Sequence, residues 1–266
     1  MKTKHLISSV VILLAGLPVC SPAQSLGSAA SFAALGTSTV TSTGGTILTG
    51  DLGVYPGTTT TGFGAGSVIG TIYDGVPVAQ QAEADAQTAY AALYNEVPGL
   101  PTLTGTDLGG LILSPGVYNF TSSAQLTGTL TLNALDDPNA LFVFQIGSTL
   151  TTAVDAAVVL ENEAQAGNVY WQVGSSATIG VGTTMAGSIL AFSSITLNNG
   201  ASLDGNALAL NGAVTLDDNS ITVTAIPEPS ASWLFLLGAL GFGARYCAKN
   251  FTVAVQIPAA VKITTH

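Results

Sequence analysis

Residues 175–223 contain three consecutive copies of a short β-rich repeat. Thr178, Thr196 and Thr215 occupy equivalent positions in the three copies, 18 and then 19 residues apart, and Gly and Asn residues interrupt the apolar runs. A repeat of about 20 residues built from short strands is typical of a β-solenoid, in which each coil buries its apolar side only against the neighbouring coils. We therefore expect an all-β fold in which these threonines stack in one column.

Three series of strands extend this repeat towards the N-terminus. The first series is apolar at successive positions, which indicates a sheet covered on both sides. The second series places a polar residue between two mostly apolar ones, which indicates a sheet covered on one side only. The third series carries mixed residues on its outward side, and it would form the third side of a triangular solenoid. The first series comprises residues 117–120, 141–144, 169–173, 189–192 and 207–210; the second 124–126, 150–152, 177–179, 195–197 and 214–216; the third 129–132, 157–160, 184–186, 202–204 and 220–222.

Residues 77–97 are predicted to form one long helix. Glu83 and Asp85 favour its first half through the helix dipole, and Pro98-Gly99 ends it. A rod of about 20 residues measures ~30 Å, and about six coils spaced by ~4.8 Å stand equally tall. We therefore place the helix parallel to the stacking axis, against the first series. Its expected buried face comprises Ala79, Ala82, Ala86, Tyr90, Leu93 and Val97.

Residues 1–23 have the pattern of a secretory signal peptide. Lys2 and Lys4 precede an apolar run from residue 6 to residue 17, and Ser21-Pro22-Ala23 offers small residues for cleavage. The alternative, a membrane anchor, is disfavoured because the run is too short to cross a bilayer comfortably. The mature chain then begins with residues 25–75, which are rich in Thr, Gly and Ser. We expect them to form a first β coil followed by an irregular loop.

Near the C-terminus, Pro227-Glu228-Pro229 precedes an apolar run over residues 231–244, and Arg245 follows it. With this pattern, residues 226–245 resemble the PEP-CTERM sorting signal of exported bacterial proteins. The resemblance implies a protein that is secreted or held at the surface of a Gram-negative bacterium, with the membrane contacted through this segment alone. Residues 246–266 form an atypical tail, since such signals normally stop soon after the basic residues. The predicted solenoid domain thus covers residues 24–225.

The distribution of charge excludes several classes of function. All five Lys and Arg residues and both His residues lie outside residues 24–244. A surface without cations cannot neutralise phosphates, which argues against nucleic acid as a partner. The same residues contain no Cys, so only carboxylates and Tyr could serve in acid–base chemistry. We therefore predict a protein that is not an enzyme and uses no cofactor.

The outward side of the second series carries small hydroxyl groups and no charge. Such a grid, spaced by ~4.8 Å between coils and ~6.7 Å along a strand, can order water into an ice-like array. Threonine also suits any solvent-facing strand, which is the simpler interpretation. The absence of Lys and Glu, which usually protect an exposed sheet, favours a functional surface. One column reads Gln125, Thr151, Thr178, Thr196, Thr215, and a second, two residues earlier, reads Ser123, Thr149, Ser176, Ser194, Ala213.

Two other groups of residues allow functional interpretations. Asp136-Asp137 and Asp217-Asp218, with Asp204, could hold a hard cation such as Ca²⁺ or act as a glycosidase pair, although acidic residues in solenoid turns are usually just solvated. We predict no metal site there. Aromatic residues could form a carbohydrate platform, but their position in the doubly apolar sheet favours core packing: Tyr118, Phe142, Phe144, Tyr170 and Trp171.

Several motifs accompany the predicted helix between residues 25 and 223: residues 32–36 (FAALG), 46–54 (TILTGDLGV), 116–118 (GVY), 168–175 (NVYWQVGS) and 211–216 (NGAVTL). With these features the chain resembles the microbial ice-binding proteins with a discontinuous β-solenoid fold. The resemblance implies a right-handed triangular solenoid whose N-terminal coil stacks among later ones, with the helix on one face. It also implies that a flat face binds ice.

Two hypotheses follow for the function. In the first, the protein is an exported monomer that adsorbs to an ice crystal surface through Thr149, Thr151, Ser176, Thr178, Ser194, Thr196 and Thr215, with the third series as the next candidate surface. In the second, the same solenoid is a structural or adhesive envelope protein that holds exopolysaccharide or other matrix. A test for inhibition of ice recrystallisation separates the two.

Overall fold

The computed structural model describes residues 25–99 and 102–223. All of them belong to the first of two units, Met1–Thr224 and Ala225–His266. The predicted signal peptide, sorting signal and tail lie outside the described residues. Within the described ranges, no helix is both long and apolar enough to cross a bilayer.

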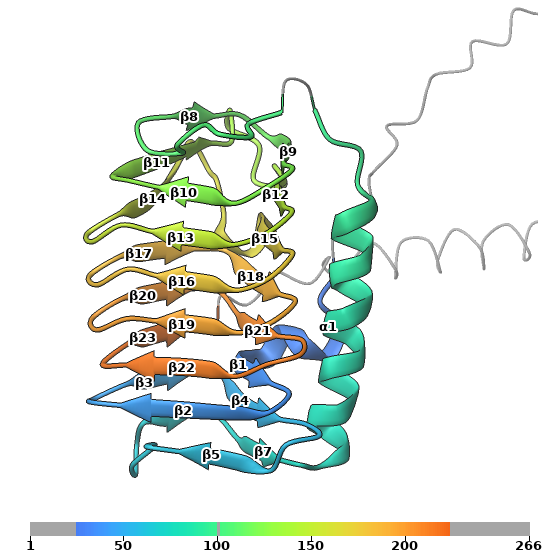
Figure 1. The fold of residues 1–266 in the computed structure, drawn as a ribbon, viewed down its shortest axis with the longest axis vertical. Helices are drawn as coiled ribbons and strands as arrows, with labels where there is room; N and C mark the ends of the chain where they lie inside the picture. The colour runs from blue at the N-terminus through green and yellow to red at the C-terminus, as the bar shows by residue number, and fades with distance from the viewer. Residues whose placement is uncertain (1–24, 100–101, 224–266) are drawn as a thin grey trace, which may run out of the picture. The chain divides into compact units, whose positions relative to one another are not determined.

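Three parallel sheets form a right-handed, three-sided solenoid, as predicted (Figure 1). Each complete coil contributes one strand to each sheet, and β7 and β8 belong to incomplete coils at the two ends of the stack. Sheet A contains β7 (Ile72–Asp74), β4 (Asp51–Val54), β1 (Phe32–Gly36), β21 (Ala207–Ala209), β18 (Ser188–Ala191), β15 (Val169–Val173), β12 (Phe142–Ile146) and β9 (Gly116–Phe120), in spatial order. Sheet B contains β10 (Ala124–Leu126), β13 (Leu150–Thr152), β16 (Ala177–Ile179), β19 (Ile195–Leu197), β22 (Val214–Asp217), β2 (Thr39–Thr43) and β5 (Thr59–Thr61). Sheet C contains β6 (Val68–Ile69), β3 (Ile47–Thr49), β23 (Ser220–Thr222), β20 (Ser202–Asp204), β17 (Thr184–Ala186), β14 (Ala157–Glu161), β11 (Thr129–Asn133) and β8 (Ile112–Leu113).

The order of the coils in space differs from their order in the sequence. Strands β1, β2 and β3 pair with β21, β22 and β23, so the N-terminal part of the chain continues the stack below its C-terminal coil (Figure 1). Residues 51–74 form β4 to β7 and continue the stack further, so the irregular loop expected after the first coil was wrong. These strands are only two to four residues long. Strands this short are recognised by their pairing with a neighbouring coil, and the local periodicity of the sequence does not reveal that pairing.

A buried amide joins the two parts of the chain where they meet. Asn206, directly before β21, donates hydrogen bonds through Nδ2 to the carbonyl oxygens of Phe32 at 2.7 Å and Ala30 at 3.1 Å. Its Oδ1 accepts a hydrogen bond from the Ser188 hydroxyl at 2.8 Å. One side chain therefore connects two C-terminal coils to the N-terminal segment.

Inside the solenoid, aromatic residues of neighbouring coils stack on one another. The Phe144 ring lies 4.0 Å from Trp171 and 5.5 Å from Tyr118, measured between centroids. Trp171 Nε1 donates to the Ala186 carbonyl at 2.9 Å, so the indole is satisfied within the core. Tyr118 is half-buried, and Phe142, Phe144, Tyr170 and Trp171 are buried. The prediction that these aromatics serve core packing is confirmed.

Helix α1 (Pro77–Asn95) covers sheet A and runs along the stack, as predicted (Figure 1). The short 3₁₀ helix η1 (Gly27–Ser31), which the sequence did not indicate, shares this covering role through Leu26 and Ala29. A second 3₁₀ helix, η2 (Ala166–Asn168), precedes β15. The residues buried between α1 and sheet A are Ala79, Ala82, Ala86, Ala89 and Leu93 on the helix and Leu35, Val143, Tyr170, Leu190 and Leu208 on the sheet.

The C-terminal end of α1 is fixed by a side chain from sheet A. Gln145 Nε2 donates to the carbonyl oxygens of Leu93 and Glu96, both at 2.8 Å. The Leu93 carbonyl also accepts from the Glu96 amide at 3.3 Å, at a helix end where the last carbonyls lack the usual intrahelical partners. Glu96 is already extended, so Val97 leaves the helix and is 84% exposed. The predicted burial of Val97 was therefore wrong.

Glu83 does not act as the helix-dipole charge that the sequence predicted. Its side chain is buried in the cover of sheet A at 4% exposure, and neither carboxylate oxygen has a hydrogen-bond partner within the described residues. This burial raises the pKa of its carboxyl from 4.5 to about 8. At neutral pH the buried acid is therefore mainly protonated, and it does not act as a helix-dipole charge. Asp85, in contrast, accepts hydrogen bonds from the Ser28 backbone at 2.7 Å and hydroxyl at 2.6 Å.

The substitution Glu83→Gln should stabilise the protein in a pH-dependent way. Between pH 4.5 and about 8, the folded protein holds a proton that the unfolded chain releases, so its free energy of unfolding falls as the pH rises. Glutamine is neutral at every pH, so the variant should gain about 3 kcal/mol over the parent at pH 7 and little at pH 4.5. Urea unfolding at both pH values measures this difference. Glu161→Gln, at an exposed position of β14, is the control, and an equal gain for Glu83→Gln at both pH values would contradict the assignment.

Candidate functional site

Sheet B presents a flat outward face whose central column is made almost entirely of threonine. Each strand of its C-terminal part alternates as predicted, with apolar side chains such as Ala177 and Ile179 buried on either side of an outward Thr178. The strand register aligns the outward residues across the sheet. The central column reads Gln125, Thr151, Thr178, Thr196, Thr215, Thr41 and Thr61.

The threonine hydroxyls of the central column are free of protein hydrogen bonds. Within the described part of the chain, none of the six threonines in this column uses its side chain as a donor or acceptor to another residue. Adjacent strands repeat at ~4.8 Å, so these hydroxyl and methyl groups form a regular row. The row has the geometry and the free hydrogen-bonding capacity to hold ordered water.

The flanking column, two residues earlier on each strand, is partly occupied by internal hydrogen bonds. Ser176 Oγ accepts from the Ser194 amide at 3.4 Å, and Ser194 Oγ accepts from the Ala213 amide at 3.2 Å. Thr149 Oγ1 donates to Ser123 Oγ at 2.9 Å. These hydroxyls shape the corner before each strand. The seven predicted residues thus share one face, but Thr151, Thr178, Thr196 and Thr215 have the freer side chains.

Four threonines of this face were missed by the sequence analysis. Thr39 and Thr59 extend the flanking column, and Thr41 and Thr61 extend the central column by two strands. They lie more than 80 residues before Thr149 in the chain, yet β2 pairs directly with β22. The alternation of residues 37–43 was visible in the sequence. The register of this segment against Thr215 depends on long-range pairing, so it was not visible in the sequence.

Sheet C is a less regular surface than sheet B. Its outward positions mix hydroxyls with exposed apolar side chains, including Val159, Ile47 and Ile69. A hollow of about 480 Å³ interrupts it beside Asp204 and Met185. A flat crystal plane would meet an uneven, partly charged surface here. The geometry therefore favours sheet B over the third series as the candidate site.

The carboxylates considered as metal or glycosidase residues do not converge. Asp136 and Asp137 follow β11, and Asp218 precedes β23, which lies four strands away in sheet C. Asp218 Oδ1 accepts from the Gly45 amide at 3.0 Å, and Asp217 Oδ1 accepts from the Thr43 hydroxyl at 2.8 Å. Among the described residues, no group of three or more His, Cys, Asp or Glu side chains could hold a metal ion. These aspartates shape turns and the edge of sheet B.

The fold and this face define a class: a discontinuous parallel β-solenoid with one helix-covered side and one flat, hydroxyl-bearing side. The Ice-binding-like family model matches residues 34–222. The chain belongs to this family.

Similar proteins share both sequence and structure with this chain. An ice-binding protein from Nostoc sp. (strain HG1) is 56% identical over 179 residues, covering 67% of this chain and 66% of that protein. Ice-binding protein 1 of Shewanella frigidimarina (strain NCIMB 400) is 35% identical over 222 residues, covering 72% of this chain but 25% of that protein. The crystal structure of an ice-binding protein from an Antarctic biological consortium matches with a TM-score of 0.73 and 43% identity, covering 83% of this chain and 96% of that one. The chain thus spans less than two thirds of the first two relatives.

Proposed function

We propose that this chain is an exported ice-binding protein that adsorbs to ice through the outward face of sheet B. The supporting observation is the central column, in which six aligned threonines carry hydroxyls without protein partners in the described structure. Family membership and the names of its relatives agree with this function.

The proposed mechanism is adsorption, with no chemical step. Threonine methyl groups order the water above them, and the free hydroxyls hydrogen-bond that water into the crystal lattice. No single contact is strong, so affinity depends on many threonines lying in one plane at a regular spacing. The uncharged surface supports this, because a charged side chain would hold its own hydration shell. An adsorbed protein then halts growth of the ice beneath it.

The proposed active residues are Thr149, Thr151, Ser176, Thr178, Ser194, Thr196 and Thr215, extended by Thr39, Thr41, Thr59 and Thr61. The protein acts as a monomer, since one face suffices for adsorption. The signal peptide predicted at residues 1–23 and the sorting-signal resemblance of residues 226–245 support export to the surface of a Gram-negative bacterium, with the C-terminal segment proposed as a transient or stable anchor.

A structural or adhesive role is the second candidate. The sorting-signal resemblance of residues 226–245 favours it, because retention at the envelope requires no ice. A purified protein that fails to slow ice recrystallisation at micromolar concentration would support this role over the first.

Replacing Thr178 and Thr196 together with tyrosine should abolish inhibition of ice recrystallisation. Two rings would stand above the plane in the middle of the central column and hold the remaining threonines away from ice. We expect the minimal inhibitory concentration to rise at least about tenfold, equivalent to ~1.4 kcal/mol of adsorption energy, with an unchanged unfolding temperature. The matched control is Thr131→Tyr with Thr222→Tyr on sheet C, and loss of activity in that control instead would move the site there.

Replacing Thr41 and Thr61 with tyrosine should also reduce activity, by a similar factor of about ten. The prediction follows from their place in the same column, although they come from the other end of the domain sequence. Ice recrystallisation and unfolding temperature are measured as before. Full activity in a folded Thr41→Tyr, Thr61→Tyr protein would limit the ice contact to strands β10 to β22.

A further inference from the structure

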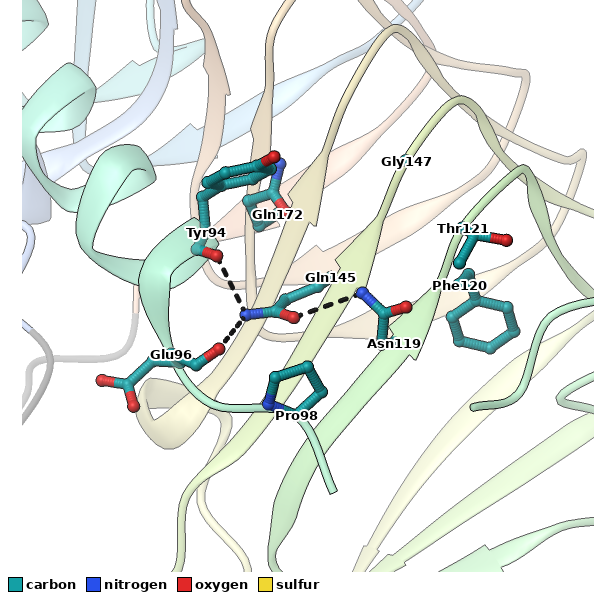
Figure 2. A pocket seen from close by; sticks show the side chains of 9 residues that line it. All are labelled: Tyr94, Glu96, Pro98, Asn119, Phe120, Thr121, Gln145, Gly147 and Gln172. Carbon is teal, nitrogen blue, oxygen red and sulfur yellow. Dashed lines mark hydrogen bonds between the residues drawn. The ribbon is translucent and has the colours of Figure 1, made fainter. Parts of the chain in front are cut away.

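An aromatic trough lies at the corner between sheets A and B, beside the C-terminal half of α1. Its walls are Tyr90 and Tyr94 of the helix and Phe192, which follows β18. Tyr94 also lines a second hollow with Asn119 and Thr121, shown in Figure 2. The two hollows measure about 340 and 380 Å³. They share the Tyr94 wall, and together we call them the corner trough.

Glycine backbone lines part of the corner trough, at Gly147 in one hollow and at Gly174 in the other, and the side chains of Gln145 and Gln172 lie beside it. Backbone hydrogen bonds extend the sheet A ladder past its strands, which aligns Thr121, Gly147, Gly174 and Phe192 on successive coils. The close approach of the coils explains the glycines, because a Cβ on Gly174 would lie 2.6 Å from the Gly147 carbonyl oxygen. Three strand spacings of ~4.8 Å separate Thr121 from Phe192, so the trough is ~14 Å long.

Two of the three aromatic side chains that form the walls are exposed, and the third, Tyr90, is half-buried. Tyr94 is 67% and Phe192 is 49% exposed. Phe192 lies 6.3 Å from Tyr90, at an interplanar angle of 44°. Exposed apolar side chains that gather around a hollow mark sites of interaction more often than isolated ones do. Phe192 lies between β18 of sheet A and β19 of sheet B, so the corner trough adjoins the proposed ice-binding face, but none of the outward threonines of sheet B lines it.

Polar groups at the other end of the trough can meet hydroxyls. Asn119 donates to Gln145 Oε1 at 3.3 Å, while its own Oδ1 has no partner within the described residues (Figure 2). Thr121 is exposed beside it, although its hydroxyl shares a hydrogen bond with the Thr104 hydroxyl at 3.1 Å. Glu96 is the one carboxylate lining the trough, and residues 25–223 contain no Lys, Arg or His. A polyanion would therefore find no positive partner.

We propose that the corner trough binds a neutral oligosaccharide, such as a segment of an uncharged surface polysaccharide. A sugar ring presents an apolar face that stacks on an aromatic side chain and a rim of hydroxyls that suits amide and hydroxyl partners. Sites of roughly 300–1,000 Å³ with aromatic walls and few polar groups fit ligands of this size. A protein partner would need about 800 Å² of contact surface, which a trough ~14 Å long does not offer. The site adjoins sheet B but uses none of its outward threonines, and it does not depend on ice adsorption.

Titration of the purified full-length chain with defined hexasaccharides tests this proposal. Isothermal titration calorimetry with cellohexaose, maltohexaose and mannohexaose should show saturable binding of at least one of them, and an alginate hexamer should not bind. Tyr94→Ala and Phe192→Ala should each weaken binding about tenfold, whereas Tyr94→Phe, which keeps the stacking face, should retain it. The side chains of Tyr94 and Phe192 are both exposed, so the variants should fold, and their unfolding temperatures verify this.

The threonine variant Thr178→Tyr, Thr196→Tyr separates the two proposals. It should lose ice activity and keep oligosaccharide binding, whereas Tyr94→Ala should do the reverse. The absence of heat with every neutral hexasaccharide at about 10 mM would overturn the oligosaccharide site, since even a weak site of millimolar Kd would be detected. Binding that persists in both alanine variants, or binding of alginate alone, would overturn it as well.

Discussion

Parallel stacking of coils at a single strand spacing is the constraint on which this structure depends. Backbone hydrogen bonds run along the stack, so each coil is held by its neighbours and cannot bury its apolar side alone. Equivalent positions therefore repeat at ~4.8 Å on every side. This repetition produces the ring stack of Tyr118, Phe144 and Trp171 in the core and the threonine row on the surface.

A stack of this kind must also be closed at its ends, because unpaired edge strands invite association. At the upper end, residues 102–111 cross the first complete coil, where Leu108 is buried and Asp107 Oδ1 accepts from the Gly109 and Thr127 amides. At the lower end, β4 to β7 continue the sheets before α1 returns along the stack (Figure 1). Helix α1 thus connects the two ends and covers sheet A on the way.

The three sides of the solenoid differ because different partners cover them. Sheet A is apolar on both sides, since α1 and η1 pack on its outer surface. Sheet B is apolar inside and hydroxyl-bearing outside, while sheet C combines hydroxyls, apolar groups and Asp204. The corner trough lies where the helix cover ends and sheet B begins. Adsorption to a flat crystal and binding of a narrow polymer would therefore use adjoining but distinct surfaces.

The sequence by itself determined the strand series over residues 117–222, the helix and its covering role, and the seven predicted residues on one face. Those features follow from local alternation and from a repeat within one continuous stretch. Only the tertiary structure decided that Thr39, Thr41, Thr59 and Thr61 join that face, and that the Ser176 and Ser194 hydroxyls are engaged by backbone amides. It also decided the burial of Glu83. The reason is physical: parallel pairing between β2 and β22 joins segments some 170 residues apart through backbone hydrogen bonds, which leave no periodic signature in either segment.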